Sequence, residues 1–190
     1  DFGQGLIASR PGPARGTARG PMGLAIRLNR APVCSWSVAF VGLGVIFGYF
    51  IRTVRELFSV NPALAEIFAA GATLPAQLVA GFLATVVTLI GIVAAVAGVQ
   101  IVNRVRTEEL EDRVDPVLAT AVGRARYLAP NVLVAFAAPA LFVLISGVII
   151  GALAAAAHIG LNFGYPPLQA LATIPAVWTV IALAVAVIGA

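Results

Sequence analysis

Long apolar stretches alternate with shorter polar ones along the chain, and four of the apolar stretches are close to the length of a membrane-spanning helix. They cover residues 33–51, 78–102, 132–157 and 174–190. With a rise of about 1.5 Å per residue, a helix over each stretch crosses most or all of a hydrocarbon core. Trp36 and Tyr49 stand near the two ends of the first stretch, where aromatic side chains are expected at a membrane interface. The pattern predicts an all-α fold, a polytopic bundle of transmembrane helices.

The segments before the first span have a different character. Residues 1–20 are rich in Pro, Gly and Arg and have few side chains able to pack, which predicts a linker or tail. Residues 21–32 have an apolar side and a polar side, so we expect a short amphipathic helix lying along the membrane interface. Pro32 should end this helix, because proline lacks the backbone N–H that a helix interior needs.

The segment between the first and second spans is only weakly charged, because its two arginines and two glutamates nearly cancel, and the segment between the third and fourth spans has no Asp, Glu, Lys or Arg. Asn61 and Pro62 form a helix-start signal, and we expect an interfacial helix from there to Gly71 on the far side of the membrane. Residues 158–173 are predicted to be a loop leading to the fourth span. Within the spans, Pro139 and Pro175 should bend their helices, because each removes one backbone donor.

The polar segment 103–131 separates the second and third spans, and it holds five of the arginines and five of the eight acidic residues. We expect the second helix to continue past the membrane to Val114. Asp115 can cap a following helix and Pro116 suits its first position, so a two-turn helix from Pro116 to Val122 is predicted. Gly123 supplies the permissive stop just past its end.

Composition and charge place the chain in a membrane. Its residues are 61% hydrophobic and 11% charged, and its mean hydropathy is +1.01, which excludes an ordinary soluble domain. Five arginines precede the first span and five lie in segment 103–131, whereas the other two loops have two and none. The positive-inside rule therefore predicts that residues 1–32 and 103–131 are cytoplasmic in a multi-pass cell-membrane protein. Because the orientation of the chain in the membrane already explains where these arginines lie, we expect no nucleic-acid partner.

Several chemistries find no support in the residues. None of the four stretches contains Asp, Glu, Lys, Arg or His, although ion-coupled carriers usually place an ionisable group in the membrane. The single histidine, His158, and the single cysteine, Cys34, are far apart in sequence, so no metal site or catalytic pair is predicted. Glycines four residues apart are expected where membrane helices pack closely on each other. The pairs are Gly44 with Gly48 and Gly147 with Gly151.

The stretch EELEDRVDPVLATAVGRARYL in segment 103–131 resembles the cytoplasmic loop of ABC transporter permeases of the drug and polyketide-antibiotic exporter type. Those permeases show paired glutamates followed by a pattern close to Leu-Ala-Thr-Pro-Val-Ser-Arg. Glu108 and Glu109 match the acidic pair. The residues that match the second pattern are Leu118, Ala119, Thr120, Val122 and Arg124, whereas Ala121 and Gly123 depart from it. Weaker similarity, based on pattern, extends over nearly all of the chain.

The resemblance implies a permease subunit of an ATP-driven exporter that moves hydrophobic drugs or antibiotics out of the cell. In such exporters a short transverse helix docks into a separate ATPase subunit, present in two copies, which binds ATP and Mg²⁺. This chain would then be no enzyme and hold no cofactor, and its partners would be that ATPase, the other half of the permease and the lipid bilayer. The implied coupling residues are Glu108, Glu109, Asp115, Pro116, Val117, Leu118, Thr120, Val122 and Arg124.

Three alternatives stay open. Segment 103–131 could be a solvated loop without a partner. The protein could instead be a channel or ion-coupled carrier, or a structural membrane subunit that transports nothing.

The chain starts at Asp1 with no initiator methionine and stops inside an apolar run at Ala190, so we also expect it to be part of a longer polypeptide.

Overall fold

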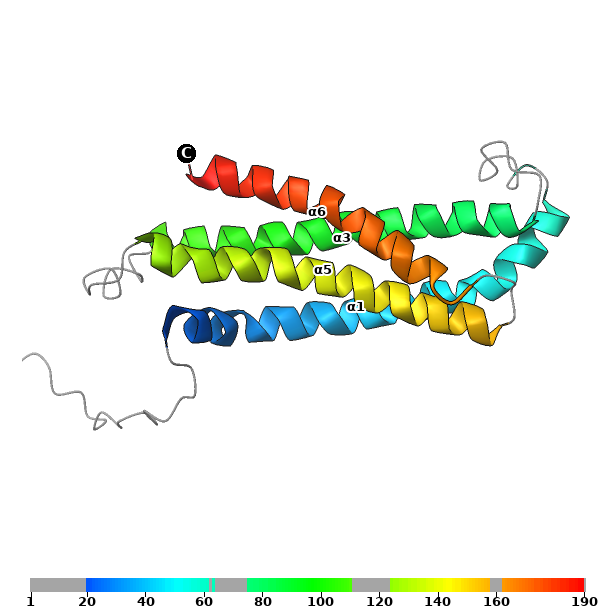
Figure 1. Cartoon of the computed structure of the whole chain (residues 1–190), viewed down its shortest axis with the longest axis horizontal. Coiled ribbons are helices and arrows are strands. Elements are labelled where there is room, and N and C mark those ends of the chain that lie inside the picture. Colours follow the sequence, from blue (N-terminus) through cyan, green and yellow to red (C-terminus); the bar gives the residue numbers. More distant parts are fainter. Residues whose placement is uncertain (1–19, 62, 64–74, 111–123, 158–161, 190) are drawn as a thin grey trace, which may run out of the picture.

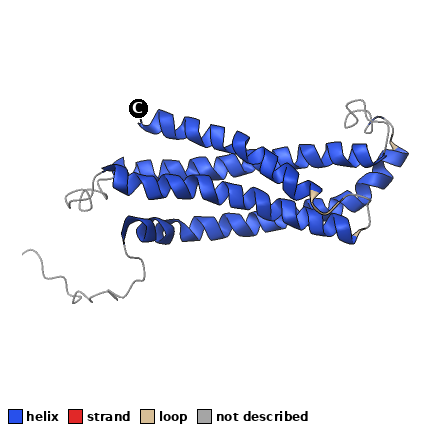
Figure 2. Cartoon of the chain, in the orientation of Figure 1, coloured by secondary structure: helices blue, strands red, loops and turns tan. Residues whose placement is uncertain are grey.

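The structure is a computed structural model that describes residues 20–61, 63, 75–110, 124–157 and 162–189. Its elements are α1 (Gly20–Val60), α3 (Pro75–Leu110), α5 (Arg124–Ala156) and α6 (Tyr165–Gly189) (Figure 1). No strand occurs in this part of the chain (Figure 2). The all-α helical bundle predicted from the sequence is confirmed.

Each helix contains a stretch long and apolar enough to cross a membrane. These stretches are Met22–Ile51, Val79–Thr107, Leu128–Ala156 and Tyr165–Val187. Each overlaps one of the four predicted spans. At 29 and 30 residues, the first three exceed the roughly 20 residues that a hydrocarbon core requires, so their polar ends extend into the headgroup region.

Successive helices run in alternating directions. The start of α1, the end of α3 and the start of α5 lie at the same end of the bundle, which we call the arginine end (Figure 1). Arg27 and Arg30 of α1 are exposed there, together with Arg104 and Arg106 of α3. The arginine counts predicted that the segments before the first span and after the second lie on one side of the membrane, and the helix directions agree.

The break predicted at Pro32 is wrong. Residues 21–32 and 33–51 belong to the single helix α1, with Pro32 in its interior. A proline removes one backbone hydrogen bond, but contacts with neighbouring helices allow membrane helices to tolerate this loss. Here Ala25 and Asn29 are buried before the proline and Phe40 is buried after it, so tertiary packing holds both sides in line.

The boundary of the fourth helix also differs from the prediction. We expected a loop through residue 173, but α6 begins at Tyr165 and places Pro166 and Pro167 in its first turn. Prolines suit this turn because its N–H groups have no partner inside the helix. The N–H of Tyr165 instead bonds the carbonyl of Asn162 at 3.0 Å, and the Asn162 side chain accepts a bond from the Gly164 N–H at 3.4 Å. This turn starts α6 at Tyr165, before the apolar stretch that was predicted to begin at residue 174.

The buried core lies between α5 and the other three helices and also between α3 and α6. α5 packs against α1, α3 and α6, whereas α1 packs chiefly on α5 and much less on α3. The largest fully buried side chains include Phe40 of α1, Leu83 of α3, Phe142 of α5 and Ile181 of α6. α5 is therefore the helix that connects α1 to the rest of the bundle, in which α3 and α6 also pack directly on each other.

Candidate functional site

The predicted coupling residues flank or occupy the connection between α3 and α5. Glu108 and Glu109 lie in the last turn of α3, and Arg124 is the first residue of α5. The others lie outside the described residues, as do the linker over 1–19, most of the expected helix from Asn61 to Gly71, and His158. The undescribed coupling residues are Asp115, Pro116, Val117, Leu118, Thr120 and Val122.

The described helix ends define where this connection is anchored. α3 and α5 end and begin at the arginine end of the bundle, beside the start of α1 (Figure 1). Val102 and Val105 of α3 are still buried, whereas Asn103, Arg104 and Arg106 are exposed. The last described turns of α3 therefore carry an apolar stripe on the bundle and a polar face away from it, and the segment 111–123 joins two helices already held together.

A buried polar contact ties α1 to α5 close to this anchor. The side-chain amide of Asn29 donates to the carbonyl of Ala25 at 2.9 Å and to the side-chain oxygen of Asn131 at 3.2 Å. Asn29 is 3% exposed and Asn131 is 4% exposed. An amide buried among apolar side chains is costly unless it is hydrogen-bonded, so this pair favours one register between the two helices.

The same register continues along the whole seam between α1 and α5. The rings of Phe40 and Phe142 stack with centroids 5.1 Å apart. The hydroxyl of Ser146, which is fully buried, donates to the carbonyl of Phe40 at 2.8 Å. Partners on α5 are thus numbered 102 to 106 higher than those on α1, so the two helices run parallel in continuous contact.

Gly44 and Gly48 lie on the α1 side of this seam. A Cβ placed on Gly44 would be 3.1 Å from Cβ of Ile149 and 3.2 Å from Cα of Ser146. A Cβ on Gly48 would lie 2.5 Å from Cδ1 of Leu153. Ordinary carbon contacts are about 3.5–4.0 Å long, so the absence of a side chain at both positions sets how closely the helices approach.

Gly147 and Gly151 set how closely α5 and α6 approach each other. A Cβ on Gly147 would be 2.7 Å from Cβ of Ala170, and one on Gly151 would be 2.8 Å from the carbonyl oxygen of Phe163. The start of α6 therefore rests directly on the backbone of α5. Both glycine pairs named from their spacing lie at helix contacts.

Trp178 makes a second link between α5 and α6. Its indole N–H donates to the carbonyl of Phe136 at 3.1 Å, and its ring meets the Phe136 ring edge-on with centroids 6.2 Å apart. Pro139 lacks the N–H that would bond the carbonyl of Ala135, one residue before Phe136. Side chains of neighbouring helices commonly satisfy carbonyls near such interruptions.

Sequence reasoning missed some residues of these seams. Asn29 was assigned only to the polar side of residues 21–32 and Asn131 only to the polar segment 103–131, although an amide next to a span is a recognisable candidate for a helix-to-helix bond. Gly98 was also missed. A Cβ there would lie 2.5 Å from Cδ1 of Ile181 and 2.9 Å from Cγ of Pro139, and its spacing of seven from Gly91 places both on one face of α3.

Metal-binding and nucleophilic groups are sparse in the described part of the chain. No three His, Cys, Asp or Glu side chains gather there, and its buried polar side chains are Asn29, Asn131 and Ser146. What these residues build is a set of fixed contacts between the described helices.

Two comparisons bear on what such an arrangement does. The family model described as multidrug efflux system permease Rv1217c, C-terminal domain, matches residues 19–190. The multidrug efflux system permease protein Rv1217c of Mycobacterium tuberculosis (strain ATCC 25618 / H37Rv) is 38% identical over 198 residues. That alignment covers 100% of this chain and 35% of the relative, so the chain spans about a third of the relative's length.

Proposed function

The chain belongs to the family of the Rv1217c-type multidrug efflux permease C-terminal domain, and from this premise we propose that it is the membrane part of a drug exporter driven by ATP. In this proposal hydrophobic drugs or antibiotics are the substrates. A separate ATPase subunit, in two copies, binds ATP and Mg²⁺ and hydrolyses the ATP, so this chain itself carries no catalytic site. The remainder of the permease completes the translocation pathway.

The observation that carries the proposal is the convergence of α3 and α5 at the arginine end (Figure 1). The segment between them bears the motif that resembles the ATPase-docking loop of ABC exporters, from Glu108 to Arg124. Because both helices are packed into the bundle, a force on this segment would reach the spans directly. The arginines of the same end support a cytoplasmic position, where an ATPase would find its ATP.

The apolar residues of the loop suggest how the ATPase would be held. Val117, Leu118 and Val122 are apolar in a segment that is otherwise rich in charge. A hydrophobic cleft on a partner would explain them, with the surrounding charges fixing register and partner choice more than affinity. Ion coupling has less support, because no Asp, Glu, Lys, Arg or His occurs in 33–51, 78–102, 132–157 or 174–190.

The test is Leu118→Asp in the full-length permease, co-expressed with its ATPase. A charge placed in the joint would lack a partner, so we expect weaker co-purification of the ATPase and loss of drug-stimulated ATP hydrolysis at normal membrane abundance. Arg126→Gln, which changes a charge in the same region, is the control and should do much less. Wild-type assembly and stimulation in Leu118→Asp would show that segment 103–131 is a solvated loop without a coupling role.

A further inference from the structure

Each proline inside a helix leaves one backbone carbonyl, four residues earlier, without its usual hydrogen-bond donor. The interiors of the described helices contain four such prolines: Pro32, Pro130, Pro139 and Pro175. In a hydrocarbon core such a carbonyl is costly, because no water is present to donate a hydrogen bond. The place of each freed carbonyl therefore decides whether it needs a donor from another helix.

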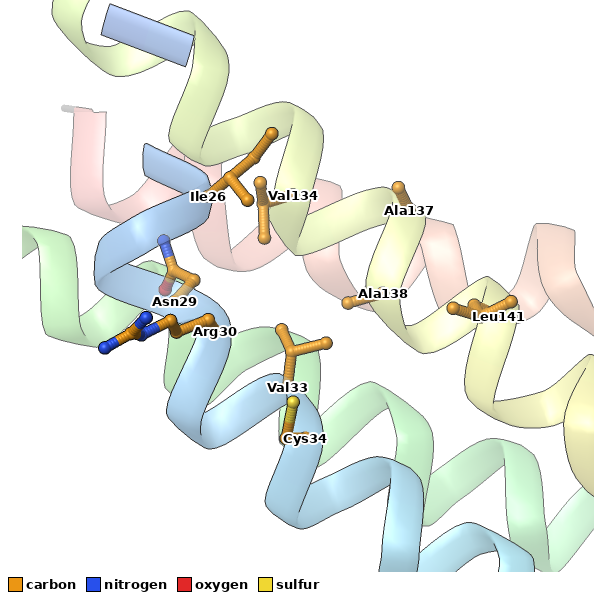
Figure 3. Close-up of a pocket in the computed structure, with 9 residues that line it drawn as sticks. All are labelled: Ile26, Asn29, Arg30, Val33, Cys34, Val134, Ala137, Ala138 and Leu141. Atoms are coloured by element: carbon orange, nitrogen blue, oxygen red, sulfur yellow. The ribbon is translucent and has the colours of Figure 1, made fainter. Parts of the chain in front are cut away.

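The carbonyls freed by Pro32 and Pro130 lie at the arginine end. Pro130 frees the carbonyl of Arg126, in the first turn of α5. Pro32 frees the carbonyl of Leu28, two residues before Arg30, whose guanidinium reaches outward from α1 in Figure 3. Arginines mark the surface of the membrane, where water can donate to both carbonyls. These two interruptions therefore need no further helix.

The carbonyl freed by Pro139 lies inside the bundle. It belongs to Ala135, which is fully buried, as is Pro139 itself. The next carbonyl of α5, that of Phe136, accepts the indole N–H of Trp178 at 3.1 Å. A side chain of the neighbouring helix α6 thus supplies a donor beside this interruption, which is a common arrangement in membrane proteins.

The carbonyl freed by Pro175 lies in the middle of a span and on an uncovered side of α6. The apolar stretch of α6 is Tyr165–Val187, so Pro175 stands close to its midpoint. The freed carbonyl is that of Leu171. Leu171 is 49% exposed and Pro175 is exposed as well. In the part of the chain that the structure describes, no side chain donates to this carbonyl.

The side-chain donors that follow Leu171 in α6 are already used. The hydroxyls of Thr173 and Thr179 each donate to a carbonyl of α6, at 2.9 Å and 2.7 Å, and Trp178 donates to α5. The acyl chains of lipids carry no N–H or O–H. A donor for the carbonyl of Leu171 must therefore come from outside the described helices.

The same side of α6 has the shape of a close helix contact. A stripe of residues spaced alternately by three and four positions runs along it, and each member is exposed. The members are Ala172, Pro175, Thr179, Ala182 and Ala186. Small side chains at this spacing let the backbones of two membrane helices approach closely. The carbonyl of Leu171 lies beside this stripe and adds a chemical requirement to the shape, a partner that brings a donor.

We propose that a further transmembrane helix packs on this stripe of α6 and donates a side-chain hydrogen bond to the carbonyl of Leu171. The helix belongs to the remainder of the permease. The inference takes from the proposed function only that such a remainder exists, as in the relative, of which the alignment covers 35%. The donor is a side chain of Ser, Thr, Asn, Gln or His, since these groups form hydrogen bonds between membrane helices.

The first test identifies the partner by cross-linking in the full-length permease in its native membrane. All native cysteines are replaced, and a photoreactive label is attached to a cysteine introduced at Ala182. Mass spectrometry of the cross-linked peptides should find one predominant product, a membrane segment outside residues 1–190 that contains such a donor. A label at Ala152, which is exposed near the end of α5, is the control and should not give this product.

A double-mutant cycle then tests the hydrogen bond. Pro175→Ala restores the N–H that the carbonyl of Leu171 lacks, so the donor of the partner loses its acceptor. With Pro175 present, replacing the donor residue by an apolar one of similar shape should lower the cross-linking yield in mild SDS about threefold, the effect of one hydrogen bond between membrane helices. In the Pro175→Ala background the same replacement should have no effect.

Three results would overturn the proposal. Cross-linking of the label to lipid alone would show that the stripe faces the bilayer. Reaction of the cysteine at Ala182 with a membrane-impermeant thiol reagent would show that water reaches the stripe and can satisfy the carbonyl. An equal effect of the donor replacement with and without Pro175 would separate the helix contact from the carbonyl of Leu171. Each result can occur while Leu118→Asp still uncouples the ATPase, so it would leave the proposed function standing.

Discussion

The contact of Gly147 with Ala170 offers a direct test of how α5 and α6 are held together. A Cβ added at Gly147 would lie 2.7 Å from Cβ of Ala170, about 1 Å closer than carbon atoms normally approach. Overpacking of this kind typically costs about 1–3 kcal/mol, because the neighbouring backbone must shift. We therefore expect Gly147→Ala to destabilise the bundle by about 2 kcal/mol.

The reciprocal change should reverse most of this loss. Ala170→Gly alone removes one buried methyl group and a good helix former, which together cost about 2 kcal/mol. In the double variant Gly147→Ala, Ala170→Gly the methyl group has only moved across the seam. The double variant should then lie within about 1 kcal/mol of wild type, far from the sum of the single effects.

Unfolding of the purified full-length permease by increasing SDS in mixed micelles, followed by circular dichroism, measures these differences. Gly42→Ala is the matched control, since a Cβ at Gly42 meets nothing within 4 Å and should cost no stability. If the two changes at 147 and 170 simply add, the close approach of α5 and α6 is not what glycine at 147 provides, and the packing argument fails.

Three further predictions concern topology, the loop and the α1–α5 seam. In a background without Cys34, cysteines at Arg124 and Asn162 should be labelled from opposite sides of the membrane, the first from the cytoplasm; labelling from one side would contradict the alternating helices. Asp115→Ala should cost about 1 kcal/mol of local helix stability and lower transport at normal membrane abundance, whereas an equal fall in protein and activity would mean a folding role alone. Ser146→Ala should destabilise the bundle by about 0.6 kcal/mol, the usual worth of one hydrogen bond between membrane helices, in the same SDS titration; no measurable change would mean that the bond is not stabilising.

Hydropathy was sufficient to predict the order of the four membrane-spanning helices in the described residues, because an apolar run of about 20 residues has few stable alternatives to a membrane helix. Hydropathy did not predict the residues at which these helices begin and end. Pro32 was expected to break a helix, but packing on both sides of it outweighs one lost hydrogen bond. Pro166 and Pro167 were assigned to a loop, although the first turn of a helix accepts proline without loss.

The contacts between helices were predictable only in part. The spacing of Gly147 and Gly151 indicated a packing face, but spacing alone cannot name the opposite helix, which is set by the tertiary arrangement. The bond between Asn29 and Asn131 joins residues 102 positions apart. No local sequence pattern predicts a contact between residues so far apart in the chain. For the loop from Asp115 to Val122, the helix-start signals stay predictions, since these residues lie outside those described.

The parallel seam of α1 and α5 restricts how these two helices can move. Sliding one along the other would drive Leu153 out of the notch at Gly48 and break the bond from Ser146 to Phe40, and both losses would occur at once. Tilting the two helices as one body disturbs neither contact. A push delivered where α5 begins would therefore be expected to move α1 together with α5. Packed helices that cannot slide past each other move as one rigid body.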